Sequence, residues 1–316
     1  MKVDNPSKQH FLSKTYALAI FATLCCALWG SAPSCIKLGY SLFQIEAGRT
    51  LDIILFAGIR FALAGSLVIL FYSLMRRKPV IPQKASWKPI LCLSLAQTAF
   101  QYLFYYVGAA NASGVKTSIL SGSGAFFSVL VACLVFRQEK LTARKLLGCM
   151  AGLAGIIMVT LQGNSDVLTG SVSLIGEGCI LFSSLSSGFS SSMVRIFSQK
   201  HNAVMLSGYQ FLIGGLILII IALVGGGTLP VVSISGLVIV LYLALVSAVA
   251  YTLWSLLLQH NPVSRVTVFN FLIPVFGVFL SGILLGEGGI FSITTAVSLL
   301  LVCGGILLVN YRKKGV

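Results

Sequence analysis

Long apolar runs dominate this sequence and follow one another with only short polar connections. Ten of them are close to or above the ~20 residues that a helix needs to cross the hydrocarbon core of a bilayer. With 57% hydrophobic and only 9% charged residues, a soluble domain could not bury this much apolar surface. The sequence therefore predicts an all-α integral membrane protein. Its ten transmembrane helices are expected at residues 15–36, 51–74, 89–109, 116–136, 144–162, 172–194, 203–224, 234–258, 264–285 and 290–310.

The basic residues indicate how these helices are oriented. Cytoplasmic loops retain lysine and arginine, and most of the 22 basic residues lie inside when the helices alternate from a cytoplasmic N-terminus. Residues 1–14 then form a cytoplasmic tail, and both termini of this multi-pass protein of the cell (plasma or inner) membrane are cytoplasmic. The net charge of +15 is spread between the spans, so we expect the lipid bilayer as a partner and no nucleic acid.

Two parts of the chain resemble each other at a separation of about 150 residues. The run GIRFALAG at 58–65 matches GYQFLIGG at 208–215, with two glycines and a phenylalanine in register. Each half would hold five helices, and because five is an odd number the second half enters the membrane from the opposite side. The sequence therefore predicts two inverted five-helix repeats, residues 15–162 and 172–311.

Several short motifs, in this order, resemble the drug/metabolite transporter superfamily, specifically its ten-helix EamA-type members. They are ALWGSAP in the first helix, GIRFALAG in the second, FRQEKLT after the fourth, GE opening the sixth, and a proline-containing helix ending in LLGE. The resemblance covers roughly residues 15–311. It implies a central cavity opened alternately to either side, and export or exchange of small metabolites, but it does not specify the substrate. The first half departs from the pattern at Phe126, which corresponds to Pro274.

Polar side chains at helical spacing indicate which faces could line such a cavity. On the third span Gln97, Gln101 and Tyr105 recur every four residues, and polar groups within a bilayer face other helices or water rather than lipid. The corresponding face of the eighth span carries Tyr251, with Trp254 beside it. We expect these faces to bind substrate, although interhelical hydrogen bonds in a packed bundle would produce the same pattern.

Two prolines lie inside predicted helices. Each leaves the carbonyl four residues earlier without its amide donor: Pro33 frees the carbonyl of Trp29, and Pro274 that of Asn270. With Thr267 on the Pro274 face, these groups could bind the polar parts of a substrate in an alternating-access site. Alternatively, neighbouring residues satisfy the freed carbonyls, as is frequent in membrane helices.

Serines add two further candidates for substrate binding. Ser187 holds a position in the opening helix of its half similar to that of Trp29, and Ser121 lies on the fourth helix. The run FSSLSSGFSSS at 182–192 around Ser187 is otherwise typical of helices that approach closely through small residues.

Few charged side chains lie within the spans, and we assign them structural or gating roles. Arg60 lies deep enough to need a partner or water; it could contact a substrate carboxylate or phosphate, or pair with backbone carbonyls or Glu177. Glu177 could carry a coupling proton or stabilise a helix N-terminus. Glu139 and Glu287, each at the end of a span, are expected to cap helices and fix turns.

The expected lining is mostly neutral and aromatic. It suits small amphipathic metabolites, amino acids foremost, better than multiply charged phosphates, which would need several basic residues. We therefore expect a secondary transporter rather than an enzyme, with alternating access. No metal or other cofactor is expected, because the three histidines lie in connections and the eight cysteines have no metal-ligand spacing.

Three other functions stay open at this point. They are an integral membrane enzyme acting on lipid-like substrates, for which the sequence offers only scattered acids, a multidrug efflux carrier, and a channel. The substrate, the direction of transport, the coupling ion and the oligomeric state are undetermined, and a monomer is compatible with the sequence.

Overall fold

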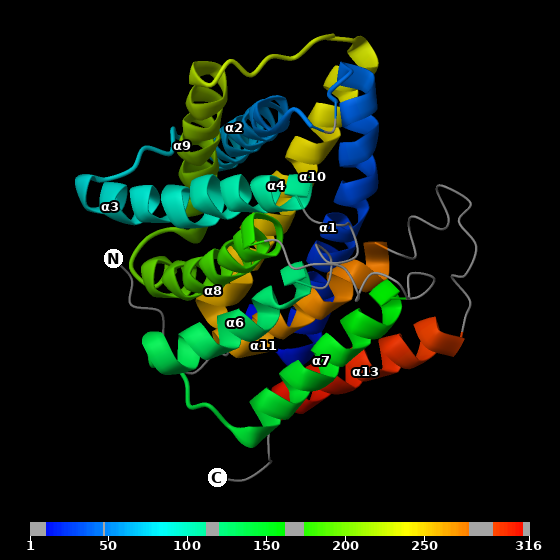
Figure 1. Ribbon diagram of the computed structural model, residues 1–316. Helices are drawn as coiled ribbons and strands as arrows, with labels where there is room; N and C mark the ends of the chain where they lie inside the picture. The colour runs from blue at the N-terminus through cyan, green and yellow to red at the C-terminus, as the bar shows by residue number, and fades with distance from the viewer. Residues whose placement is uncertain (1–10, 47, 112–119, 162–173, 278–292, 312–316) are drawn as a thin grey trace.

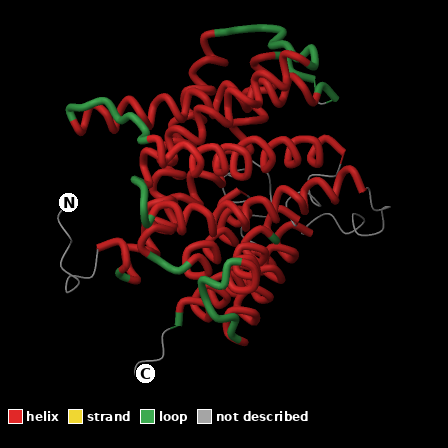
Figure 2. Tube along the Cα trace, turned by 90° about the vertical axis from the view of Figure 1, so that its left-hand side faces the viewer, coloured by secondary structure: helices red, strands yellow, loops and turns green. Residues whose placement is uncertain are grey.

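The computed structural model describes residues 11–46, 48–111, 120–161, 174–277 and 293–311, and within these ranges it contains helices and connecting loops but no strand (Figures 1 and 2). The α-helices are α1 (Thr15–Phe43), α2 (Thr50–Arg76), α3 (Lys84–Leu93), α4 (Gln101–Asn111), α6 (Gly124–Leu130), α7 (Ala143–Leu161), α8 (Cys179–Ser198), α9 (Ala203–Val224), α10 (Ile234–His260), α11 (Val263–Thr267) and α13 (Ile293–Asn310). Other helical segments are the 3-10 helices η1 (Phe11–Ser13) and η6 (Val268–Phe271) and the π-helices η2 (Ser94–Phe100), η3 (Val131–Val135) and η5 (Leu174–Gly178).

Each of the ten predicted spans coincides with helix in the described residues. Within the described ranges, five helical segments are long and apolar enough to cross a bilayer: Thr15–Phe43, Thr50–Arg76, Lys84–Ala109, Ala203–Val224 and Ile234–His260. Large apolar side chains stay exposed on the outside of the helices, among them Leu74, Met75, Ile220, Val224 and Leu300. The bilayer is the solvent that such a surface requires, and the prediction of a helical multi-pass membrane protein is confirmed.

Polar side chains start two of the long helices. The Asn202 side chain accepts a hydrogen bond from the backbone N–H of Met205 at 2.9 Å, and Ser233 Oγ accepts one from Gly236 N–H at 3.1 Å. These are N-caps, which satisfy amide groups that have no partner in the first turn. They explain why α9 and α10 begin where the apolar runs begin.

Helices α2 and α9 lie side by side and pack through glycines (Figure 1). A Cβ atom added to Gly65 would lie 2.5 Å from the carbonyl oxygen of Gly208, and one added to Gly215 would lie 2.8 Å from that of Gly58. Helices α7 and α13 are paired in the same way at the other end of the molecule (Figure 1). Their close contacts are Gly148 with Gly305 and Gly155 with Ser298.

The interior consists mainly of two apolar clusters. One is built around residues such as Trp254, Phe269 and Phe271, and the other around residues such as Phe56 and Phe61. The partly buried ring of Trp29 packs against both clusters. The boundary between the clusters is therefore at Trp29, near the middle of α1.

Candidate functional site

Aromatic side chains from α1, α4 and α10 meet where the two apolar clusters join. The ring centre of Trp29 lies 4.8 Å from that of Tyr251 and 5.0 Å from that of Trp254. The hydroxyl of Tyr251 is hydrogen-bonded to that of Tyr102. The structure thus brings together three of the residues predicted from the sequence and adds Tyr102, which the sequence reasoning did not include.

A π-helix explains why the third span presents Tyr102 to Tyr251. The spacing of Gln97, Gln101 and Tyr105 assumes a continuous α-helix, but Ser94–Phe100 is the π-helix η2. The wider turn rotates the residues after it by about 100° for each extra residue. Tyr102 bonds to Tyr251, and the ring of Tyr105 packs on that of Tyr106 with a centroid distance of 5.4 Å. The common face of Gln97, Gln101 and Tyr105 stays a prediction.

Serines of α8 supply donors to the carbonyls of this irregular helix. Ser186 Oγ donates to the carbonyl oxygen of Ala96 at 2.6 Å, and Ser183 Oγ donates to that of Gln101 at 2.7 Å. A π-turn disturbs the regular pairing of backbone groups, so side-chain donors of this kind are needed. The serine run serves close packing and hydrogen bonding, and the carbonyl of Ser187 itself accepts bonds from serines one turn later in α8.

Five of the predicted substrate-binding residues carry a buried polar atom that has no hydrogen-bond partner within the described part of the chain. These atoms are Trp29 Nε1, Gln97 Oε1, Gln101 Oε1, Ser121 Oγ and Asn270 Oδ1. Most buried polar groups in proteins are paired with protein or water, and an unpaired one costs ~1–3 kcal/mol. The set contains a donor, several acceptors and a hydroxyl.

The two proline-containing helices meet close to this set. A Cβ atom added to Gly30, next to Trp29, would lie 2.6 Å from the Cβ atom of Phe276. Pro33 lies within the continuous helix α1. Pro274 follows η6, the 3-10 segment that contains Asn270.

Thr267 differs from the other predicted residues of the ninth span. It is fully buried, and its hydroxyl donates to the carbonyl oxygen of Val263 at 3.0 Å within the same helix. Its hydrogen-bonding capacity is used locally, so the expectation that Thr267 offers its hydroxyl to a substrate receives no support from this geometry.

Arg60 lies beside the aromatic residues and is 4% exposed. Its guanidinium carbon is 4.3 Å from the ring centre of Phe61 and 5.9 Å from that of Tyr102. Among the described residues no carboxylate oxygen lies within 4.0 Å of its nitrogens, and Nε has no hydrogen-bond partner. The pairing with Glu177 considered from the sequence is therefore not formed, and aromatic faces surround the charge instead.

The structure describes Glu177 but not Glu287. Glu177 is 8% exposed, lies in η5 and has an interaction partner of its own. Glu287 lies outside the described residues, so its expected role as a helix cap stays a prediction.

Glu139 joins two distant parts of the chain. Its carboxylate accepts hydrogen bonds from Lys145 Nζ at 2.7 Å, from the backbone N–H of Ser264 at 3.1 Å and from Ser264 Oγ. Burial alone would raise the pKa of the Glu139 carboxyl, but the bonds from Lys145 and Ser264 outweigh burial and hold the pKa below its usual value. Ser264 is in the first turn of α11, so Glu139 caps a helix that lies far along the chain from it.

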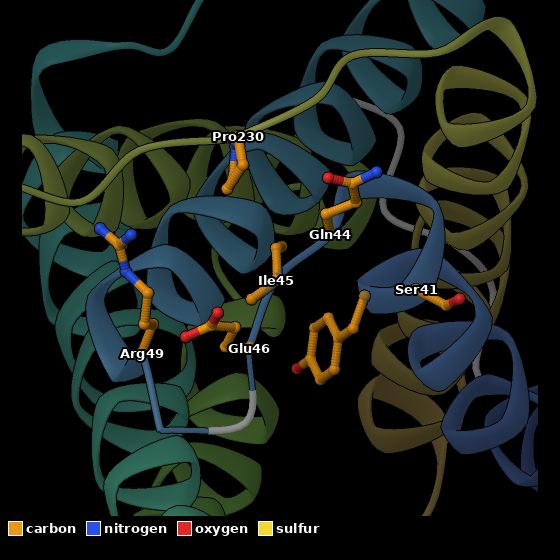
Figure 3. A pocket seen from close by; sticks show the side chains of 7 residues that line it. Ser41, Gln44, Ile45, Glu46, Arg49 and Pro230 are labelled. Atoms are coloured by element: carbon orange, nitrogen blue, oxygen red, sulfur yellow. The ribbon is translucent and has the colours of Figure 1, made fainter.

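A hollow of about 450 Å³ opens where α1 ends and α2 begins (Figure 3). In this view Glu46 and Arg49 lie on one side and Ser41 and Gln44 on the other. The hollow was not predicted from the sequence, because its walls come from two loops that show no motif. Its lining residues are Tyr40, Ser41, Gln44, Ile45, Glu46, Arg49 and Pro230.

Comparison with known proteins agrees with this architecture. A solved crystal structure superimposes on the chain with a TM-score of 0.75 at 16% sequence identity, covering 93% of this chain and 96% of the other. At that identity the match concerns the fold alone.

Curated relatives extend the comparison to function. An uncharacterized transporter of Archaeoglobus fulgidus is 25% identical over 308 residues, which are 95% of this chain and 99% of the relative. The uncharacterized transporter YetK of Bacillus subtilis is 23% identical and covers 84% of this chain, with 80% of YetK aligned. A WAT1-related chloroplastic protein of Arabidopsis thaliana is 25% identical over 81% of this chain and 62% of its own length.

The family comparison covers most of the sequence. The EamA-like transporter family matches residues 17–161 and again residues 174–311. These two matches include every helix described above except η1 and the first two residues of α1. The chain therefore belongs to the EamA-like transporter family of the drug/metabolite transporter superfamily and is a multi-pass membrane transporter for a small-molecule substrate.

Proposed function

We propose that this transporter is a secondary carrier that exposes the site around Trp29 and Tyr251 alternately to the two sides of the cell membrane. The unpartnered buried polar atoms of Trp29, Gln97, Gln101, Ser121 and Asn270 carry this proposal. A bound molecule with amino, hydroxyl or carboxyl groups would provide the missing hydrogen bonds, and its apolar part would contact the aromatic rings. Small amphipathic metabolites, amino acids or related compounds, have this chemistry.

The glycine contacts support inverted halves, residues 15–162 and 172–311. Residue n of the first half is taken to correspond to residue n + 150 of the second. Exchanging the halves then converts the contact Gly58–Gly215 into Gly208–Gly65. That pair is the other glycine contact between α2 and α9. A twofold axis between the halves would produce contacts that exchange in this way. The contacts between α7 and α13 follow the same rule: Gly148–Gly305 becomes Ser298–Gly155.

Hydrogen bonds join the halves at both ends, through Thr228 N–H and Asp52 at one end and through several side chains at the end that carries the basic loops. Glu139 bonds to Ser264 there, as described above. Alternating access requires one end of the site to be closed while the other is open, and these bonds would have to break when the carrier opens to the cytoplasm. Further bonds between the halves are Gln138–Ser192, Asn202–Tyr72, Tyr209–Val80 and Arg265–Thr15. We expect both termini on this cytoplasmic side.

A multidrug efflux carrier is the second candidate, because the rings of Trp29, Tyr251 and Trp254 could also receive lipophilic compounds. The two functions differ in which compounds are exchanged and which inhibit the exchange. An amino-acid carrier gives saturable exchange with hydrophilic compounds, whereas a multidrug carrier is inhibited by lipophilic cations of unrelated shape.

Counterflow in proteoliposomes tests the proposal. We expect saturable exchange of at least one labelled amino acid, and Asn270→Ala should lower its apparent affinity about tenfold, which corresponds to the loss of one hydrogen bond of ~1.4 kcal/mol. Thr267→Val is the matched control, since the Thr267 hydroxyl is bonded within its own helix. Equal loss in both variants, or the absence of saturable exchange with folded protein, would contradict the proposal.

A further inference from the structure

We infer that Arg60 binds the carboxylate of the substrate near the middle of the bilayer, so that the transported compound is an organic monoanion or carries one carboxylate. This inference rests on the proposed carrier function and specifies its substrate class. Four features carry it: the depth of Arg60, its burial without an acidic partner, the donors that surround it and the aromatic surface next to it.

The packing of α2 on α9 gives the depth of Arg60. Phe61 and Phe211 correspond at the separation of 150 residues, and their rings stack on each other at 5.5 Å with an interplanar angle of 12°. A residue that touches its own counterpart lies at the axis relating the two halves, and for inverted halves this axis lies in the plane of the membrane. Arg60 precedes Phe61, and one residue advances a helix by only ~1.5 Å. The backbone of Arg60 is therefore at about the bilayer midplane.

The charge of Arg60 is not balanced by the part of the protein that the structure describes. Its side chain is buried, its Nε has no hydrogen-bond partner, and no described carboxylate is within ion-pair distance. A charged group at this depth is costly unless an anion or water accompanies it. An arginine guanidinium stays protonated under such conditions, so the partner must be supplied when the carrier works.

The neighbours of Arg60 are donors rather than acids. Tyr40, Tyr102, Tyr106 and Tyr251 all lie close enough to interact with it electrostatically. In the hydrogen bond between Tyr102 and Tyr251 one hydroxyl donates and the other accepts, and the accepting hydroxyl keeps its own proton for a third partner. Guanidinium N–H groups with a phenolic O–H match the two oxygens of a carboxylate.

The same neighbours favour a carboxylate over a phosphate dianion. One arginine compensates one negative charge, and multiply charged phosphates are bound by several basic groups. Tyr251 bonds to Tyr102 beside Arg60 and packs on the ring of Trp29, whose Nε1 has no hydrogen-bond partner among the described residues. A compound with a carboxylate at one end and an apolar or aromatic body fits this order of contacts, whereas chloride would use only the cationic part.

The test compares each free amino acid with its amide, for example phenylalanine with phenylalaninamide, on purified wild-type protein in proteoliposomes. We expect at least one free amino acid to compete at least about 100-fold better than its amide, because the amide leaves the buried guanidinium unpaired. Arg60→Gln should reduce the affinity for the acid about 100-fold while changing that for the amide less than about threefold. This variant carries the residue found at the corresponding position, Gln210.

Arg76→Gln is the matched control, since Arg76 is at the exposed end of the same helix and also stacks on a tyrosine; it should retain the preference for the acid. Equal affinity of wild-type protein for acid and amide would overturn the inference and leave the carrier function standing, whereas a lack of exchange with every probe would overturn both. Stabilisation of wild-type protein but not Arg60→Gln by chloride, without preference for acids, would assign Arg60 to an inorganic anion and also refute the inference. The comparison of acid with amide on wild-type protein tests the inference even if Arg60→Gln does not fold.

Discussion

Glu139→Gln should weaken the connection between the two halves at the end that carries the basic loops. The carboxylate accepts bonds from Lys145 and from two atoms of Ser264, and its side chain is only 8% exposed. Glutamine keeps the shape but offers one acceptor oxygen, and its amide group faces another donor. Breaking a buried ion pair by removing one partner costs ~3–5 kcal/mol. Allowing for the retained oxygen, we expect the closed form of this end to lose about 3 kcal/mol of stability. That is roughly a 100-fold change in the equilibrium between its closed and open forms.

The labelling rate of Cys133 measures this change. Its thiol is buried and lies 3.9 Å from Lys145 Nζ, so a maleimide reaches it only when this end opens. In a protein with Cys133 as its sole cysteine, Glu139→Gln should increase labelling by up to about 100-fold. Glu46→Gln, at the opposite end beside the hollow, should leave the rate unchanged. Equal rates in Glu139→Gln and the parent protein would refute the assignment of Glu139 to a connection between halves.

The pH dependence follows from the same contacts. The pKa of Glu139 is below its usual value, so its contribution is fully present above the pKa of an unpaired glutamate and is lost as the pH falls through the lower pKa of the folded state. A maleimide reacts with the thiolate, so the labelling rate in Glu139→Gln gives the fall that the loss of thiolate alone causes on acidification. Divided by that rate at each pH, labelling of Cys133 in the parent protein should rise on acidification, and a ratio that does not change with pH would contradict this account.

Three further predictions concern packing and binding. Gly65→Ala should lower stability by ~1–3 kcal/mol, because its Cβ would meet the backbone of α9. Gly304→Ala has nothing within 4 Å of the added atom and should leave stability unchanged. The melting temperature in detergent measures both. Ser186→Ala should cost ~0.5–1.5 kcal/mol by removing the hydrogen bond to the carbonyl oxygen of Ala96, and an unchanged melting temperature would contradict it. Trp29→Phe keeps the ring contacts but removes the indole N–H, so substrate affinity should fall about tenfold with little change in stability.

The sequence predicts the helices well and the irregular turns poorly. Apolar runs of bilayer length identify every span, since length and hydrophobicity suffice for that. The same runs do not reveal η2, because a π-turn depends on donors from another helix, such as Ser186 Oγ on the carbonyl of Ala96. The sequence pattern therefore does not indicate that Tyr102 faces Tyr251.

Long-range partners are the second limit of the sequence reasoning. A capping role for Glu139 could be expected from its place at the end of a span, but its partner Ser264 is 125 residues away, and no local pattern indicates it. For Arg60 the sequence leaves several partners open, and of these the structure excludes the pairing with Glu177: among the described residues the rings of Phe61 and Tyr102 lie beside its guanidinium group. Packing across the fold determines both contacts.

The neutral counterpart of Arg60, Gln210, at first argues against a role in transport, since an alternating site might be expected to need a charge in each half. The location of Arg60 next to the stacked pair Phe61 and Phe211 removes this objection. When inverted halves exchange conformations, a group far from the axis moves to the position that its counterpart held, but a group at the axis stays almost in place. One arginine at the axis can therefore face a bound carboxylate in both conformations. A second arginine at Gln210 would add an unbalanced charge at the bilayer midplane, which is costly, and would offer the substrate nothing that Arg60 does not already provide.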